Sequence, residues 1–106
     1  MTVDDDDPIR TVVRVEGELD LGTAPKLSDL IDGPAAAGKR VVLDLTECGF
    51  IDSSGLRALL SARSAADAAG GSLALVVADP NILRVFEVAS LDQVLEIHPT
   101  VDAALA

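Results

Sequence analysis

The chain has 106 residues, of which 49% are hydrophobic and only 2% aromatic. This length predicts one domain, and the composition predicts a core of aliphatic side chains and alanine. Eight Lys and Arg residues stand against eighteen Asp and Glu residues, which gives a formal charge of -10. Such acidity disfavours nucleic acid and anionic membrane surfaces as partners. Apolar runs all fall short of the roughly 18 residues of a spanning helix, so we expect a soluble protein.

The N-terminal segment 1–8 carries four successive aspartates where a secretory signal needs basic residues followed by an apolar stretch. We expect this segment to be frayed or to form a short edge strand. Cys48 is the only cysteine, so no intrachain disulfide is expected, and the count fits a reducing compartment. These features predict a cytoplasmic protein. Cys48 itself is expected to be a small, partly buried residue at the end of a strand.

Two strands and two helices are predicted in the first two thirds of the chain. The β-branched run 11–15 predicts a strand, and the apolar run 41–45 predicts the central strand of a mixed or parallel sheet. Helical spacing predicts a helix over 23–31, capped by Thr23 and cut short by Gly33-Pro34. A second helix is expected over 54–69, with an Arg63 to Asp67 pair on its outer side.

The alternation continues to the C-terminus. We predict a strand over 72–77, a helix over 81–88 opened by Asp79-Pro80, a short strand over 94–97 and a last helix over 100–105. Strands that alternate with helices predict an α/β fold with right-handed crossovers and a sheet covered by helices.

No catalytic apparatus is expected. The only histidine, His98, precedes Pro99 and has no adjoining carboxylate to orient it. Ile51 stands where a hydrolase nucleophile elbow centred on Ser53 would have glycine. The chain also lacks a phosphate-binding loop, a dinucleotide fingerprint and a His and Cys cluster. We therefore predict a protein that is not an enzyme and holds no cofactor or metal.

The turn 52–55, Asp-Ser-Ser-Gly, follows the central strand and opens the second helix. Asp and Ser at this place are ordinary helix caps, and the free amides of the first turn also form an anion site. Both interpretations stay open on local composition. In open α/β sheets, however, ligand and partner surfaces gather at the carboxyl ends of the strands. This turn and the acidic loop 16–20 are both expected there.

The segments 17–20 (Gly-Glu-Leu-Asp) and 52–56 (Asp-Ser-Ser-Gly-Leu), joined by the apolar strand 41–45, resemble the STAS-domain family of bacterial anti-sigma factor antagonists. The similarity covers residues 9–106. It implies a single STAS domain, in which a mixed sheet of about four or five strands is packed against about four helices. It also implies a regulatory switch. The unmodified antagonist binds an anti-sigma factor that is also a serine kinase, and so frees the sigma factor.

The resemblance also implies roles for individual residues. Phosphorylation of Ser53 abolishes binding, and a serine phosphatase removes the phosphate. Ser54 is then a capping hydroxyl. The partner-binding residues implied are Asp20, Asp52, Ser53, Ser54, Gly55 and Leu56.

Two other classes remain as alternatives. One is a STAS accessory subunit that docks on the ATPase of a transporter without a phosphorylation cycle, which would leave Ser53 unmodified. The other is a small enzyme of thioredoxin or flavodoxin type, which requires a cysteine pair or a phosphate loop that this sequence lacks.

Overall fold

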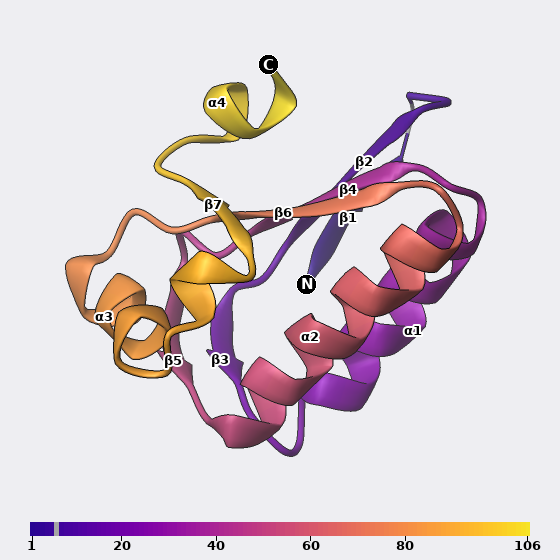
Figure 1. Cartoon of the computed structure of the whole chain (residues 1–106). Coiled ribbons are helices and arrows are strands. Elements are labelled where there is room, and N and C mark those ends of the chain that lie inside the picture. Colours follow the sequence, from indigo (N-terminus) through magenta and orange to yellow (C-terminus); the bar gives the residue numbers. More distant parts are fainter. Residues whose placement is uncertain (6) are drawn as a thin grey trace.

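A five-stranded mixed sheet forms the centre of the structure, a computed structural model that describes residues 1–5 and 7–106 (Figure 1). The order of the strands is β1-β2-β4-β6-β7. Strands β2, β4, β6 and β7 run parallel to one another, and β1 is antiparallel to β2 at one edge. These strands are β1 (Thr2–Asp4), β2 (Arg10–Arg14), β4 (Arg40–Asp44), β6 (Ser72–Val76) and β7 (Glu96–His98).

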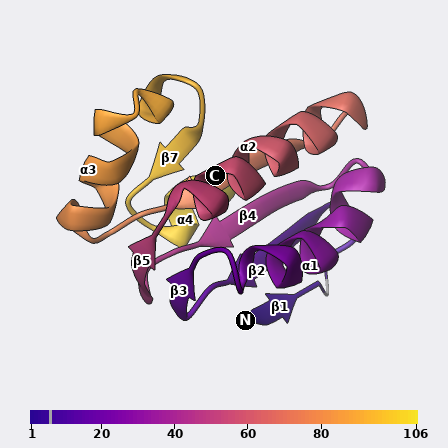
Figure 2. The same cartoon turned by 90° about the horizontal axis from the view of Figure 1, so that it is seen from below.

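Helices cover both faces of this sheet, and their bounds are α1 (Ala24–Ala36), α2 (Ser53–Ala68), α3 (Pro80–Val88) and α4 (Val101–Leu105). Figure 1 shows α1, α2 and α3 on one side of the sheet and α4 on the other. Seen from below, α3 lies apart from α1 and α2, beside β7 (Figure 2). None of the helices in the described ranges is long and apolar enough to cross a membrane. The predicted α/β class and the approximate numbers of strands and helices are confirmed.

The alternation of side chains along the strands divides the core in two. Val41 and Leu43 of β4 belong to the large cluster under α1, α2 and α3, whereas Val42 belongs to a small cluster under α4. Phe86 of α3 is fully buried in the large cluster. Strand β4 is therefore buried on both faces, as its nearly continuous apolar run predicts.

A second, two-stranded parallel sheet pairs β3 (Gly17–Leu19) with β5 (Cys48–Ile51). The segment 16–20 was expected to be a loop and no strand was predicted over 48–51, because both segments are too short to show a clear apolar alternation. Only Leu19, Cys48 and Ile51 are buried in this pair. Cys48 thus starts a strand and is fully buried, which corrects its predicted place at the end of one.

The first helix continues through Gly33 and Pro34, so the prediction that it stops there is wrong. Pro34 lacks an amide proton, but it lies only two residues from the end of α1, so the loss affects a single hydrogen bond. The next residue, Ala35, is buried in the core. Gly38, with a φ of 74°, ends the helix, because this left-handed conformation suits glycine.

The other boundaries follow the predictions closely, with two differences. The last strand begins two residues later than predicted, because a 3-10 turn, η1 (Leu91–Gln93), precedes it and Leu95 is buried before the strand starts. The hydroxyl of Thr23 does not cap α1. It donates instead to the carbonyl oxygen of Glu18, at 2.9 Å. The Arg63 to Asp67 pair is present, at 3.7 Å.

Helix α2 and strand β3 approach each other most closely at Gly55. A Cβ atom at this position would lie 2.5 Å from the carbonyl oxygen of Leu19 and 3.1 Å from the side chain of Ile51. Backbone cannot move aside as a flexible side chain does. A glycine in a helix normally costs about 1 kcal/mol relative to alanine, so steric fit decides its use here.

We expect Gly55→Ala to destabilise the fold by about 1 to 3 kcal/mol, because the added methyl overpacks the contact with β3. Urea unfolding followed by circular dichroism measures this. The matched control is Gly49→Ala, since nothing lies within 4 Å of a Cβ atom at that position. Equal unfolding midpoints for Gly55→Ala and the native chain would contradict the close approach.

Asp44 is a buried carboxylate at the end of the central strand. Burial raises its pKa, but hydrogen bonds from the hydroxyl and amide of Thr46 and from the Arg14 guanidinium outweigh burial and hold the pKa below its ordinary value of 3.8. Arg14 Nε lies 3.3 Å from the Asp44 Oδ2 atom. The ionised form therefore stabilises the native state.

We expect Asp44→Asn to lower the free energy of unfolding at neutral pH by about 1.5 to 3 kcal/mol, the range for hydrogen bonds to charged groups. Because the folded pKa is depressed, this stabilisation is complete above the ordinary pKa and is lost as the pH falls through the folded value. The difference in free energy of unfolding between Asp44→Asn and the native chain should therefore become smaller as the pH falls. Urea unfolding across this pH range, with the exposed Asp29→Asn as control, tests it, and a gap that does not change with pH is the contrary outcome.

Candidate functional site

The pairing of β3 with β5 brings the two segments of interest together. Leu19 and Ile51 are partners in this parallel ladder, so Asp20 and Asp52, the next residue of each strand, emerge side by side. The amide of Asp52 donates to the carbonyl oxygen of Leu19 at 3.2 Å. The amide of Leu21 donates to the Asp52 Oδ2 atom at 3.3 Å. The expected neighbourhood of the two acidic segments is therefore present.

Asp52 is the N-cap of α2. Its backbone is extended, and its Oδ1 atom accepts a hydrogen bond from the amide of Gly55 at 2.9 Å. Asp52 therefore caps the helix, as expected of an aspartate at this place, whereas the capping role implied for Ser54 is corrected. Ser53 is the first residue of the helix and is exposed, while Ser54 is half-buried and Gly55 is buried.

Asp20 organises the turn that leads into α1. Its Oδ1 atom accepts from the amides of Thr23, at 3.1 Å, and Gly22, at 3.0 Å. The hydrogen bond from the Thr23 amide is the main reason that the pKa of Asp20 lies below its ordinary range. Asp20 therefore stays ionised at neutral pH while it holds the turn into α1 in place.

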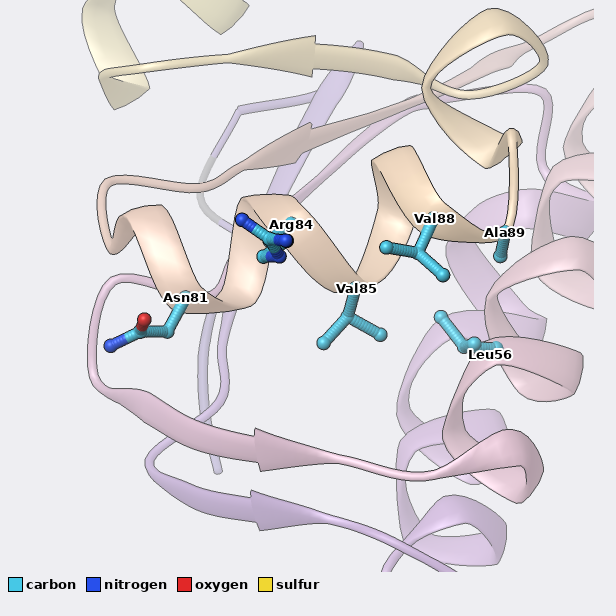
Figure 3. Close-up of a pocket in the computed structure, with 6 residues that line it drawn as sticks. All are labelled: Leu56, Asn81, Arg84, Val85, Val88 and Ala89. Carbon is cyan, nitrogen blue, oxygen red and sulfur yellow. The ribbon is translucent and has the colours of Figure 1, made fainter.

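Apolar side chains flank this polar turn. Leu21, directly after Asp20, is 75% exposed, and Phe50 of β5 is 50% exposed. Leu56, in the first turn of α2, faces α3 across an open groove of about 430 Å³ (Figure 3). Exposed apolar groups next to a polar turn are typical of a protein-binding surface.

The site residues predicted from the sequence lie at the junction of β3, β5 and α2: Asp20, Asp52, Ser53, Ser54, Gly55 and Leu56. Leu21, Phe50 and the outer face of α3 were not predicted. Phe50 could have been singled out from the sequence, because it is one of only two phenylalanines in the chain.

His98 lies outside this junction, and the Cys48 side chain is buried within it. His98 is on strand β7, and its Nε2 atom lies 2.7 Å from a carboxylate oxygen of Glu96, which corrects the prediction that no carboxylate adjoins it. Burial raises the pKa of the Cys48 thiol, which lowers its reactivity. No cluster of three or more metal-ligating side chains occurs within residues 1–5 and 7–106.

Comparisons with known proteins agree with this geometry. The family model described as STAS domain matches residues 1–104. The anti-sigma-B factor antagonist of Listeria monocytogenes is 31% identical over 84 residues, which cover 78% of this chain and 74% of that protein. The crystal structure of an anti-sigma factor antagonist from Mycobacterium paratuberculosis is 32% identical, with a TM-score of 0.86 and coverage of 98% of this chain and 88% of that one.

More distant structures share the fold. The Bacillus cell fate determinant SpoIIAA, solved in its phosphorylated form, has a TM-score of 0.74 at 22% identity, with 98% of this chain and 95% of that one covered. A sulfate transporter family protein from Wolinella succinogenes has a TM-score of 0.77 at 18% identity, with 92% and 82% covered. At these identities the likeness concerns the fold alone. The family model and the more similar antagonists decide the family: the chain belongs to the STAS-domain family of anti-sigma factor antagonists.

Proposed function

We propose that the protein is a cytoplasmic, non-catalytic anti-sigma factor antagonist controlled by phosphorylation of Ser53. The unphosphorylated form binds an anti-sigma factor that is also a serine kinase, and this binding frees the sigma factor. Transfer of a phosphate to Ser53 ends the binding. A serine phosphatase then restores the active form.

The observation that carries this proposal is the exposure of Ser53 at the first position of α2. A kinase requires a hydroxyl that it can reach, and Ser53 lies beside the carboxylate of Asp52 on a surface with exposed apolar side chains. Relatives named as anti-sigma factor antagonists, and a related fold solved in a phosphorylated form, support the same conclusion.

The effect of the phosphate follows from charge and position. It adds about -1.5 to -2 charges near neutral pH. On Ser53 these charges would stand next to Asp52 and near Asp20, at the start of α2, where the helix dipole favours an anion. The domain therefore tolerates the phosphate. A docked partner does not, because the interface would bury a poorly compensated dianion.

We expect Ser53→Ala to bind the anti-sigma factor as the native chain does, and Ser53→Asp to bind about a hundredfold more weakly. This corresponds to about 3 kcal/mol. Both variants should keep the native far-UV circular dichroism spectrum and unfolding midpoint, since Ser53 is exposed and an acidic residue suits the first turn of a helix. Isothermal titration calorimetry measures the affinities. Equal affinities of the two variants would refute the switch.

We also expect the cognate kinase and ATP to place one phosphate on the chain, at Ser53. Tandem mass spectrometry of the digested protein locates it. The matched control is the neighbouring hydroxyl, so Ser54→Ala should still be modified and Ser53→Ala should not. If the native chain takes no phosphate and instead binds a transporter ATPase, the accessory-subunit alternative is correct.

A further inference from the structure

The groove between α2 and α3 is open and mostly apolar. Its lining comes from the first turn of α2 and from one face of α3: Leu56, Asn81, Arg84, Val85, Val88 and Ala89. In Figure 3, Val85 and Val88 point from α3 toward the side of the groove that Leu56 forms. Val88 is 77% exposed, so the domain itself leaves this face uncovered.

The charge of the groove is opposite to that of the chain. The chain has eighteen carboxylate side chains and eight cationic ones, yet the groove lining contains Arg84 and no carboxylate. Glu87 belongs to the same helix but not to the lining. The groove is therefore a local cationic and apolar surface on an acidic protein.

Arg84 is also one of the few cations that form no ion pair in the part of the chain that the structure describes. Five of the eight are paired with carboxylates: Arg10 with Asp7, Arg14 with Asp44, Lys39 with Asp5, Arg40 with Glu96 and Arg63 with Asp67. Within the described residues, Lys26, Arg57 and Arg84 form no ion pair. Arg57 directly follows Leu56 and is exposed.

We propose that this groove binds an acidic amphipathic helix of the partner, whose apolar side chains pack on Leu56, Val85 and Val88 and whose carboxylates pair with Arg84. A helix in a groove needs a row of apolar contacts and a charge of the right sign beside it, and the lining supplies both. The unpaired Arg84 guanidinium can form charge-assisted, two-pronged hydrogen bonds with a carboxylate. The inference rests on the proposed function only for naming the partner as the anti-sigma factor.

The net charge of -10 does not prevent this binding. At physiological ionic strength the screening length is about 8 Å, so charges farther than this from the groove are largely screened. The surface thus selects carboxylates locally although the chain as a whole is acidic.

The test uses the full chain with methyl-labelled Leu and Val, followed by NMR at about 0.15 M salt. Two synthetic helical peptides of about four turns share one row of leucines, and their flanks carry Glu in one peptide and Lys in the other. We expect the Leu/Glu peptide to shift the methyl signals of Leu56, Val85 and Val88, and to bind at least about tenfold more tightly than the Leu/Lys peptide.

Arg84→Gln should lower the affinity for the Leu/Glu peptide several-fold. Arg63→Gln, which removes the same charge further along α2, should leave this affinity unchanged. Equal binding of the two peptides, shifts confined to other methyl groups, absence of binding, or an unchanged affinity in Arg84→Gln each overturns the inference. The measurement needs neither kinase nor anti-sigma factor. A failure of phosphorylation at Ser53 would therefore contradict the proposed function and leave this result standing.

Discussion

The parallel pairing of β3 with β5 is the constraint on which the candidate site depends. Because the two strands end at the same edge, Asp20 and Asp52 emerge together, and one carboxylate serves both segments. Asp52 accepts from Gly55 at the start of α2 and from Leu21 in the neighbouring loop. Gly55 permits this arrangement, since any side chain there would strike the backbone of β3. The loop, the helix start and Ser53 are thus held as one rigid unit.

Long periodic segments were predictable from the sequence, and short ones were not. The three middle residues of β4, Val41 to Leu43, are apolar and buried, and α2 has a buried stripe over sixteen residues, so local pattern and tertiary packing agree. Strands β3 and β5 have three and four residues and only three buried side chains between them. Their pairing depends on the fold around them. Helix α1 passes Gly33-Pro34 for a similar reason, because burial of Ala35 offsets a weak local signal.

The polar part of the site was predictable for a physical reason, since the carboxyl ends of neighbouring parallel strands meet at one edge. The groove was not. Helix α3 carries apolar residues on two sides: Ile82 and Phe86 enter the core, whereas Val85 and Val88 face outward. The sequence alone does not distinguish the two sets, because both have helical spacing. Only the packed structure separates the side that the domain covers from the side that it leaves open.

The proposed phosphate and the proposed partner helix would meet at the first turn of α2. The effect of the phosphate on the free energy of the folded domain is much smaller than its cost in a bound interface. An anion at an exposed helix start gains about 0.3 to 1 kcal/mol, so the folded domain is barely affected. Burying the same dianion under a partner costs several kcal/mol, because no described cation is already paired with Ser53 and the nearest carboxylate is Asp52. If the partner brings carboxylates to Arg84, repulsion adds to this cost. In the proposed switch, phosphorylation would therefore act on binding, through a surface whose own geometry need not change.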